Sequence, residues 1–304
     1  MTNEIPMLFI VFNRLDTTKQ VFEKIKDIKP TRLYIASDGP RKSKQGENET
    51  VDSVRNFILN SIDWVCDTRT LFRENNLGCN KAVSSAIDWF FEEEDFGIIL
   101  EDDCVPSKSF YPFCKELLEK YKNDKRISGI TGTNFNKSFV PKQNVSYHYS
   151  EILYMWGWAT WKDRWIENKD FIGNYKELMN YPLKDNIISN RKANIMWIEE
   201  SSNAISGKID TWDYQWLFSN ICNHKLTIVP AKNLIHNIGF SEEATHTKHM
   251  REDLVPPLEN IDLPLEHPKF MIRNSEYDDY FYTHIYGWAT IKERILRRIK
   301  KIFS

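Results

Sequence analysis

The sequence has few glycines, and none of them belongs to a recognisable phosphate-binding loop. Only 11 of the 304 residues are glycine. Neither the GxGxxG fingerprint of dinucleotide-binding domains nor the GxxxxGK[ST] motif of P-loop enzymes occurs anywhere in the chain. If the protein binds phosphates, a metal ion and side chains must therefore neutralise them.

Cysteine pairs, net charge and long apolar runs are also lacking. The five cysteines form no CxxC pair and leave one over, so neither a disulfide framework nor a zinc site is indicated. A net charge of -2 gives no overall reason to expect a nucleic-acid partner. The first residues are not basic, and the apolar run at 7–12 is too short for a signal peptide or a membrane span. These absences predict a cytoplasmic protein.

Short apolar runs alternate with amphipathic segments along the first third of the chain. Strands are predicted at residues 7–12, 32–36, 70–72 and 97–100, with helices at 16–28, 51–62 and 81–91 between them. Beyond these we expect a helix at 107–122 and strands at 127–131, 226–229 and 233–237. Such alternation predicts an α/β protein, a Rossmann-like α/β/α sandwich whose central sheet is mostly parallel.

The middle of the chain, residues 147–225, is rich in tryptophan and predicted to be mostly helical. Trp158, Trp161 and Trp165 share one face at helical spacing, which predicts that they are core residues on a helix. Trp156 precedes that helix beside Gly157 and is the better candidate for stacking on a sugar ring.

Three consecutive carboxylates, Glu101, Asp102 and Asp103, directly follow the apolar run at 97–100. Ligands of open α/β sheets gather at the carboxyl ends of the strands. Adjacent negative charges there need a counter-charge, and Mg²⁺ or Mn²⁺ carrying substrate phosphates would supply one. The acidic run at 92–95 precedes the strand instead, and we interpret it as a solvated face.

These motifs resemble those of a known family. The segments at 11–14 and 35–39, the acidic block at 98–103 and the later Trp212-Asp213 are similar to those of GT-A glycosyltransferases. Within that superfamily their order is most similar to N-acetylglucosaminyltransferase I and to bacterial glycosyltransferases of surface-polysaccharide loci. The resemblance spans roughly residues 7 to 247 and implies a GT-A domain over 1–250. It also implies a nucleotide-sugar donor, UDP-linked as in UDP-GlcNAc, and a saccharide or lipid-linked acceptor.

The resemblance also implies roles for individual residues. Asp38 would accept a hydrogen bond from the uracil imide, and Asp103 would bind the metal. Lys81 stands near the position of a histidine that the family has and this chain lacks. His246 could donate to the pyrophosphate or complete the metal shell. Together with the stacking candidate, the expected donor-binding residues are Asn13, Arg14, Asp38, Lys81, Glu101, Asp102, Trp156 and His246.

Asp213 falls where the family has its general base. Direct displacement at an anomeric carbon needs a carboxylate beside the acceptor hydroxyl, opposite the leaving group, and gives inversion. The segment offers a second carboxylate, Asp210, which is expected to cap a helix at 211–222. We therefore assign the base to Asp213 and a capping role to Asp210.

Two alternatives and one further segment remain open at this stage. A sugar-phosphate nucleotidyltransferase shares the architecture but needs a glycine-rich basic loop after the first strand, which residues 12–16 do not provide. A non-catalytic carbohydrate-binding protein of the same fold would need neither the acidic block nor Asp213.

Residues 251–304 are expected to be an irregular tail that ends in a basic amphipathic helix. Its last part, 288–304, either contacts the inner face of a membrane peripherally or packs on the protein.

Overall fold

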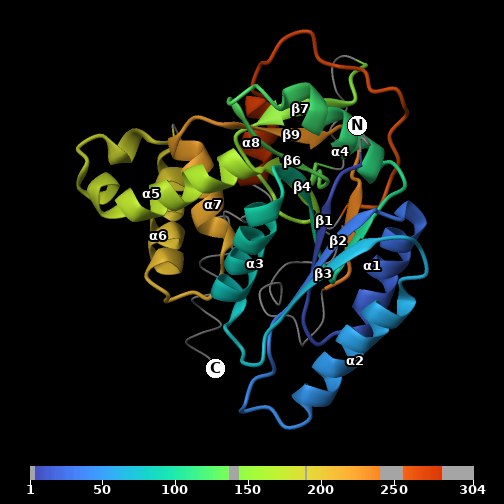
Figure 1. Ribbon diagram of the computed structural model, residues 1–304. Coiled ribbons are helices and arrows are strands. Elements are labelled where there is room, and N and C mark those ends of the chain that lie inside the picture. The colour runs from blue at the N-terminus through green and yellow to red at the C-terminus, as the bar shows by residue number, and fades with distance from the viewer. Residues whose placement is uncertain (1–3, 137–143, 189, 240–255, 283–304) are drawn as a thin grey trace, which may run out of the picture.

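One eight-stranded sheet organises the part of the chain that the computed structural model describes, residues 4–136, 144–188, 190–239 and 256–282 (Figure 1). Its strand order is β3-β2-β1-β4-β8-β6-β9-β7, and β8 and β7 run against the other six. A separate antiparallel pair joins β5 to β10. The strands are β1 (Met7–Val11), β2 (Arg32–Ser37), β3 (Asp67–Phe72), β4 (Phe96–Glu101), β5 (Cys104–Pro106), β6 (Ile127–Thr131), β7 (Tyr147–Ser150), β8 (Trp158–Trp161), β9 (Leu226–Pro230) and β10 (Ile235–Asn237).

Helices cover both faces of this sheet. On β1, Met7 and Phe9 belong to one buried cluster and Leu8 to the other, as the period of two in a strand requires. The first cluster includes α1 (Leu15–Ile28), α2 (Glu47–Ser61) and α4 (Phe110–Tyr121). The second includes α3 (Cys79–Glu93), α5 (Lys162–Asn180), α6 (Arg191–Ile205) and α7 (Asp213–Cys222). The predicted α/β/α sandwich with a mostly parallel sheet is therefore confirmed.

The tryptophan-rich segment differs from the prediction. Trp158 and Trp161 are buried, as expected, but they lie on strand β8, and the helix begins only at Lys162. Trp158 packs in the cluster of α3 and α7, whereas Trp161 faces the other side of the sheet. A spacing of three residues fits a helix, but pairing with β4 and β6 on both sides fixes the extended conformation.

The acidic run at 92–95 is exposed at Glu92, Glu93 and Asp95, as predicted for a solvated face, but Glu94 is buried. Glu94 is 5 % exposed, and its carboxylate accepts hydrogen bonds from Tyr34 Oη at 2.9 Å and from Arg32 Nη1 at 2.7 Å. Both partners lie on strand β2, which is separated from β4 by β1 in the sheet. Because those partners are about 60 residues away in the chain, the local sequence could not show that this glutamate is buried and paired.

Residues 256–282 pack against the body of the protein around a buried carboxylate. Asp278 in the short helix α8 (Ser275–Tyr280) is fully buried. It accepts hydrogen bonds from Ser150 Oγ and from Arg273 Nε at 2.8 Å, and Arg273 also pairs with Glu151. Burial raises the pKa of Asp278 to about 7 despite these donors. The predicted terminal helix at 288–304 lies outside the described residues.

This buried carboxylate should make stability depend on pH. The pKa of Asp278 is higher in the folded chain than in the unfolded chain, so the folded chain holds an extra proton between about pH 4 and pH 7. Its stabilising contribution is therefore largest at low pH and is lost as pH rises through 7. We expect the free energy of unfolding to fall by about 1.5 kcal/mol from pH 5.5 to 7 on this account. Asp278→Asn should remove that slope in denaturant titrations, and an unchanged slope would contradict the assignment.

Candidate functional site

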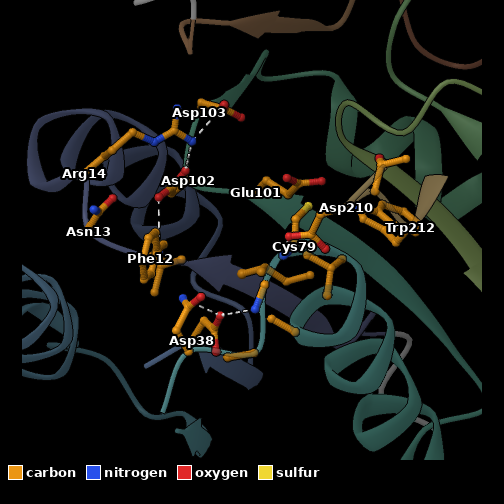
Figure 2. A pocket seen from close by; sticks show the side chains of 18 of the residues that line it. Phe12, Asn13, Arg14, Asp38, Cys79, Glu101, Asp102, Asp103, Asp210 and Trp212 are labelled. Carbon is orange, nitrogen blue, oxygen red and sulfur yellow. Dashed lines mark hydrogen bonds and ion pairs between the residues drawn. The ribbon is translucent and has the colours of Figure 1, made fainter. Parts of the chain in front are cut away.

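A cleft of about 590 Å³ opens where strands β1, β2 and β4 end. These three strands are parallel, so their carboxyl ends meet at one edge of the sheet. The residues at or directly after these ends, 12–14, 38 and 101–103, all line the cleft (Figure 2). Helix α3 and the segment at 210–214 line it from the other side. Eight of the predicted side chains therefore meet in one place: Asn13, Arg14, Asp38, Glu101, Asp102, Asp103, Trp156 and Asp213.

Arg14 bridges the two aspartates of the acidic block. Its Nη2 lies 2.9 Å from Asp103 Oδ2 and also pairs with Asp102 Oδ1. The backbone N–H of Phe12 donates to the other Asp102 oxygen at 3.2 Å. Figure 2 shows the arginine reaching across the cleft edge from the start of α1 to both carboxylates. The β1–α1 turn thus holds the acids that follow β4.

Glu101 lies at the end of β4 with no such cation on its own carboxyl group among the described ion pairs. Burial raises its pKa well above the usual range, and the charges of Asp103, Asp102 and Asp213 raise it further. Burial also raises the pKa of Asp102, to about 6, although Arg14 opposes that shift. The acidic block therefore carries unfavourable like charge, which a ligand cation would relieve.

Asp38 organises the loop that precedes α3. Its two carboxylate oxygens accept hydrogen bonds from the backbone N–H groups of Leu77 and Gly78, at 3.1 to 3.2 Å, and from Asn76 Nδ2 at 2.9 Å. Burial nevertheless raises its pKa. Because the chain's own donors already use these oxygens, Asp38 acts first as the anchor of this loop.

Several cleft residues escaped the analysis of the sequence. Arg41, Lys44 and Arg73 bring positive charge to the β2 and β3 side of the cleft. Glu47 fixes Arg41 through a multidentate ion pair and accepts from Asn13 Nδ2 at 2.9 Å. The segment at 41–49 has the composition of an ordinary polar loop, so no local signal identifies Arg41, Lys44 and Glu47 as part of a site.

The segment that leads out of β10 closes over the acidic block. Asn237 Nδ2 lies 3.4 Å from Asp103 Oδ1, and Ile238 N donates to the Asp103 carbonyl at 2.9 Å. A Cβ on Gly239 would lie 2.1 Å from Asp103 Oδ2, so any other residue would require the Asp103 carboxyl group to shift. The side chain of Asp103 is consequently only 14 % exposed.

Asp210 caps a different helix from the one predicted. Helix α7 begins at Asp213 after Trp212, and no side chain caps it. Asp210 instead accepts from the backbone N–H groups of Cys79 and Asn80, at 2.9 and 2.8 Å, in the first turn of α3. The cap therefore joins segments about 130 residues apart and ties the start of α7 to the loop that Asp38 anchors.

Asp210→Ala should lower the free energy of unfolding by about 1 kcal/mol, because two N–H groups at the start of α3 lose their acceptor. Asp210→Asn should lower the free energy of unfolding by a smaller amount, since asparagine is also a good capping residue. Urea titrations of both variants would measure the difference. Equal stability of the alanine variant and the parent would show that this cap contributes nothing.

Asp213 stands at the first turn of α7 and lines the cleft together with the acidic block. Its Oδ1 accepts from Thr211 Oγ1 and from Tyr214 N, the latter at 3.0 Å. Its charge contributes to the raised pKa of Glu101, so the two carboxyl groups lie close together in the cleft. Trp212 holds the turn in place by stacking on Trp158, with ring centroids 5.7 Å apart and planes at 25°.

Trp156 belongs to the cleft as predicted, but Lys81 does not. Trp156 is half-buried at the cleft wall, where Phe135 packs against its ring with centroids 5.3 Å apart. Lys81 is exposed in the first turn of α3 and does not line the cleft. His246 lies outside the described residues, so its predicted role stays a prediction.

The acidic block offers carboxylate oxygens to a divalent cation. No cluster of three or more Asp, Glu, His or Cys side chains arranged to hold a metal is found within the described ranges. Mg²⁺ and Mn²⁺ at phosphate sites use only one or two protein carboxylates, and substrate oxygens and water complete the shell. Asp103, at the edge of the cleft beside a second aspartate, fits that kind of site and not an all-protein cage.

None of the helices in the described part of the chain combines the length and the apolar character that crossing a bilayer requires.

Comparisons with known proteins show partial structural similarity. No protein-family model matches the sequence, and no curated protein is similar to it in sequence. A mannosyltransferase from Pyrobaculum calidifontis, solved with GDP-mannose and Mn²⁺, is 12 % identical with a TM-score of 0.36. That match covers 53 % of this chain and 46 % of the mannosyltransferase, so this chain spans about half of that protein's length.

Two further structures are similar at the same level. HddC from Yersinia pseudotuberculosis is 9 % identical, with a TM-score of 0.32 over 52 % of this chain and 77 % of its own. A UDP-glucose pyrophosphorylase complexed with UDP-glucose is 10 % identical, with a TM-score of 0.36 over 76 % of this chain and 92 % of its own.

Proposed function

We propose that the protein is a GT-A glycosyltransferase that moves a sugar from a UDP-type donor to a hydroxyl of a saccharide or lipid-linked acceptor, with inversion. One observation carries the proposal: the carboxylates at the end of strand β4 share a cleft with Asp213, which lies at the start of helix α7. Displacement at an anomeric carbon needs both features, a place for the departing phosphates and a base on the opposite side.

The residues divide into two sides according to that chemistry. Arg14 and the basic side chains at 41, 44 and 73 favour the nucleoside diphosphate, and Asp103 would hold Mg²⁺ or Mn²⁺. When bound, the cation would act as a Lewis acid that stabilises negative charge on the leaving diphosphate. Glu101 and Trp156 lie where they could contact the donor sugar, by a hydrogen bond and by stacking respectively.

Asp213 would take the proton of the acceptor hydroxyl as its oxygen attacks the anomeric carbon. The new glycosidic C–O bond forms while the bond from that carbon to the diphosphate oxygen breaks, and the nucleoside diphosphate leaves with the electron pair. The negative charge of Asp213 is among the causes that raise the pKa of the neighbouring Glu101, so the two carboxyl groups interact in the cleft.

The connection after β1 argues against the nucleotidyltransferase alternative. Strand β1 ends at Val11 and α1 begins at Leu15, so only three residues join them. One of these, Phe12, is fixed by its N–H bond to Asp102. This turn leaves no room for the glycine-rich basic loop that the alternative requires.

Ligand binding and product analysis together test the proposal. We expect UDP to raise the melting temperature in the presence of Mn²⁺, and ligand at 100 times its dissociation constant would add about 2.7 kcal/mol of stability. A panel of nucleotide sugars with Mn²⁺ should then reveal slow donor hydrolysis for one of them. Pyrophosphate formation from a nucleoside triphosphate and a sugar phosphate would favour the nucleotidyltransferase. No binding of any nucleotide would reject both enzymes.

A further inference from the structure

The ion pair of Arg14 occupies the same carboxylates that a cation would need. Its guanidinium lies 2.9 Å from Asp103 Oδ2 and also contacts Asp102. Within the described part of the chain, no other lysine or arginine forms an ion pair with residues 101–103. Among the described residues, Arg14 is therefore the only ion-pair partner of the acidic block, and it pairs with two of its three acids.

The surroundings of Arg14 fix its backbone but leave its charged end at the cleft. Its carbonyl accepts from Thr18 N at 3.1 Å and Thr18 Oγ1 at 2.6 Å, which anchors the residue at the start of α1. The side chain is 26 % exposed, compared with 5 % for Asp102 and 14 % for Asp103. The Arg14 side chain is thus more accessible than either aspartate, and it already lines the cleft that the phosphates would enter.

The charge balance changes when a nucleoside diphosphate enters with a divalent cation. A cation on Asp103 would lie next to the Arg14 guanidinium, which is bonded to the same carboxylate. The two positive charges would repel each other strongly, because the site is largely shielded from solvent. The phosphates offer the guanidinium a planar, bidentate acceptor of the kind that arginine favours. Both charges are satisfied if the arginine exchanges its partners.

We propose that Arg14 is a built-in counter-ion of the acidic block, which a divalent cation displaces from Asp103 onto the donor phosphates. This role rests on the proposed function, and it implies that tight binding of the cation requires the nucleotide. Before the nucleotide arrives, the arginine competes with the cation and keeps it weakly bound. Once the phosphates are present, the same side chain helps to hold them.

Arg14→Gln tests this exchange because its two expected effects have opposite signs. Without nucleotide, the variant should bind Mn²⁺ about tenfold or more tightly than the parent, because the competing charge is gone. Without metal, it should bind UDP about tenfold more weakly, because a phosphate contact is lost. Electron paramagnetic resonance of free Mn²⁺ at pH 8 would measure the first effect, and calorimetry with UDP the second.

Two further variants complete the test. Arg126→Gln removes an equal charge from an exposed pair with Asp124, before β6 at the opposite edge of the sheet, and should change neither affinity. Arg14→Lys keeps the charge but not the planar fork, so it should bind Mn²⁺ alone with an affinity between those of the parent and the glutamine variant. If Arg14→Gln does not fold, the lysine variant alone decides the question.

The possible outcomes distinguish the role of Arg14 from the proposed glycosyltransferase function. Unchanged or weaker Mn²⁺ binding by Arg14→Gln, or by Arg14→Lys in its place, would overturn the role of the arginine. If the parent then still binds Mn²⁺ more tightly with UDP, the proposed function stands. Failure of the parent to bind Mn²⁺ with UDP would overturn both.

Discussion

Asp213→Asn should lower the rate of sugar transfer by roughly 10²–10⁴-fold, the usual contribution of a general base, while donor affinity stays unchanged. An amide cannot accept the proton of the acceptor hydroxyl. It does keep the Oδ1 oxygen that accepts from Thr211 and Tyr214, so the turn at the start of α7 should keep its shape. Single-turnover transfer and calorimetry with the donor would measure the two quantities separately.

Asp170→Asn is a suitable control for the same change of charge. Asp170 is an exposed residue of α5, outside the cleft-lining residues, and its replacement should leave transfer unaffected. Near-normal turnover of Asp213→Asn would assign the base elsewhere. Reduced donor affinity in that variant would instead indicate that Asp213 binds the donor and has no role as a base.

The parallel half of the fold and its strand ends were predictable from local patterns. Short apolar runs at 7–12, 32–36 and 97–100 correspond to β1, β2 and β4, because fully buried strands are apolar on both faces. Once those strands are parallel, the polar residues that follow each of them must share an edge. That rule alone brings Arg14, Asp38 and the acidic block into one cleft.

Features that depend on pairing between distant segments were not predictable in this way. The four residues of β8 are too short to show a period, and only their pairing with β4 and β6 makes them a strand. Asp210 is followed by a helix in the sequence, yet its acceptor atoms serve α3. A cap is a local signal, but which helix it caps is decided by the tertiary fold.

The partners of the acidic block show the same limit. The sequence indicates that three adjacent carboxylates need a positive charge, but not which one is supplied. The structure places Arg14 on two of them, and the burial of Glu101 raises its pKa. The approach of Gly239 to Asp103 depends on the pairing of β10 with β5, so the sequence of neither segment alone predicts it.

Asp103→Ala should abolish the metal-dependent part of UDP binding, because the cation loses its carboxylate at the cleft edge. A unit charge pair at about 4 Å and an effective dielectric near 20 is worth roughly 4 kcal/mol. The loss in metal-dependent affinity for UDP should therefore be at most about 10³-fold. The variant also releases Arg14 from one partner, so binding of UDP without metal should not weaken. Calorimetry with UDP, with and without Mn²⁺, should therefore give the same affinity for the variant and different affinities for the parent.

Asp95→Ala is the matched control for this prediction. Asp95 precedes β4 where Asp103 follows it, so the same strand carries the two changes at opposite edges of the sheet. The control should bind UDP more tightly with Mn²⁺, as the parent does. If Asp103→Ala keeps the parent's Mn²⁺-dependent affinity, the cation is not bound at this edge. The leaving diphosphate would then have Arg14 and the basic side chains at 41, 44 and 73 as its only counter-charges within the described cleft.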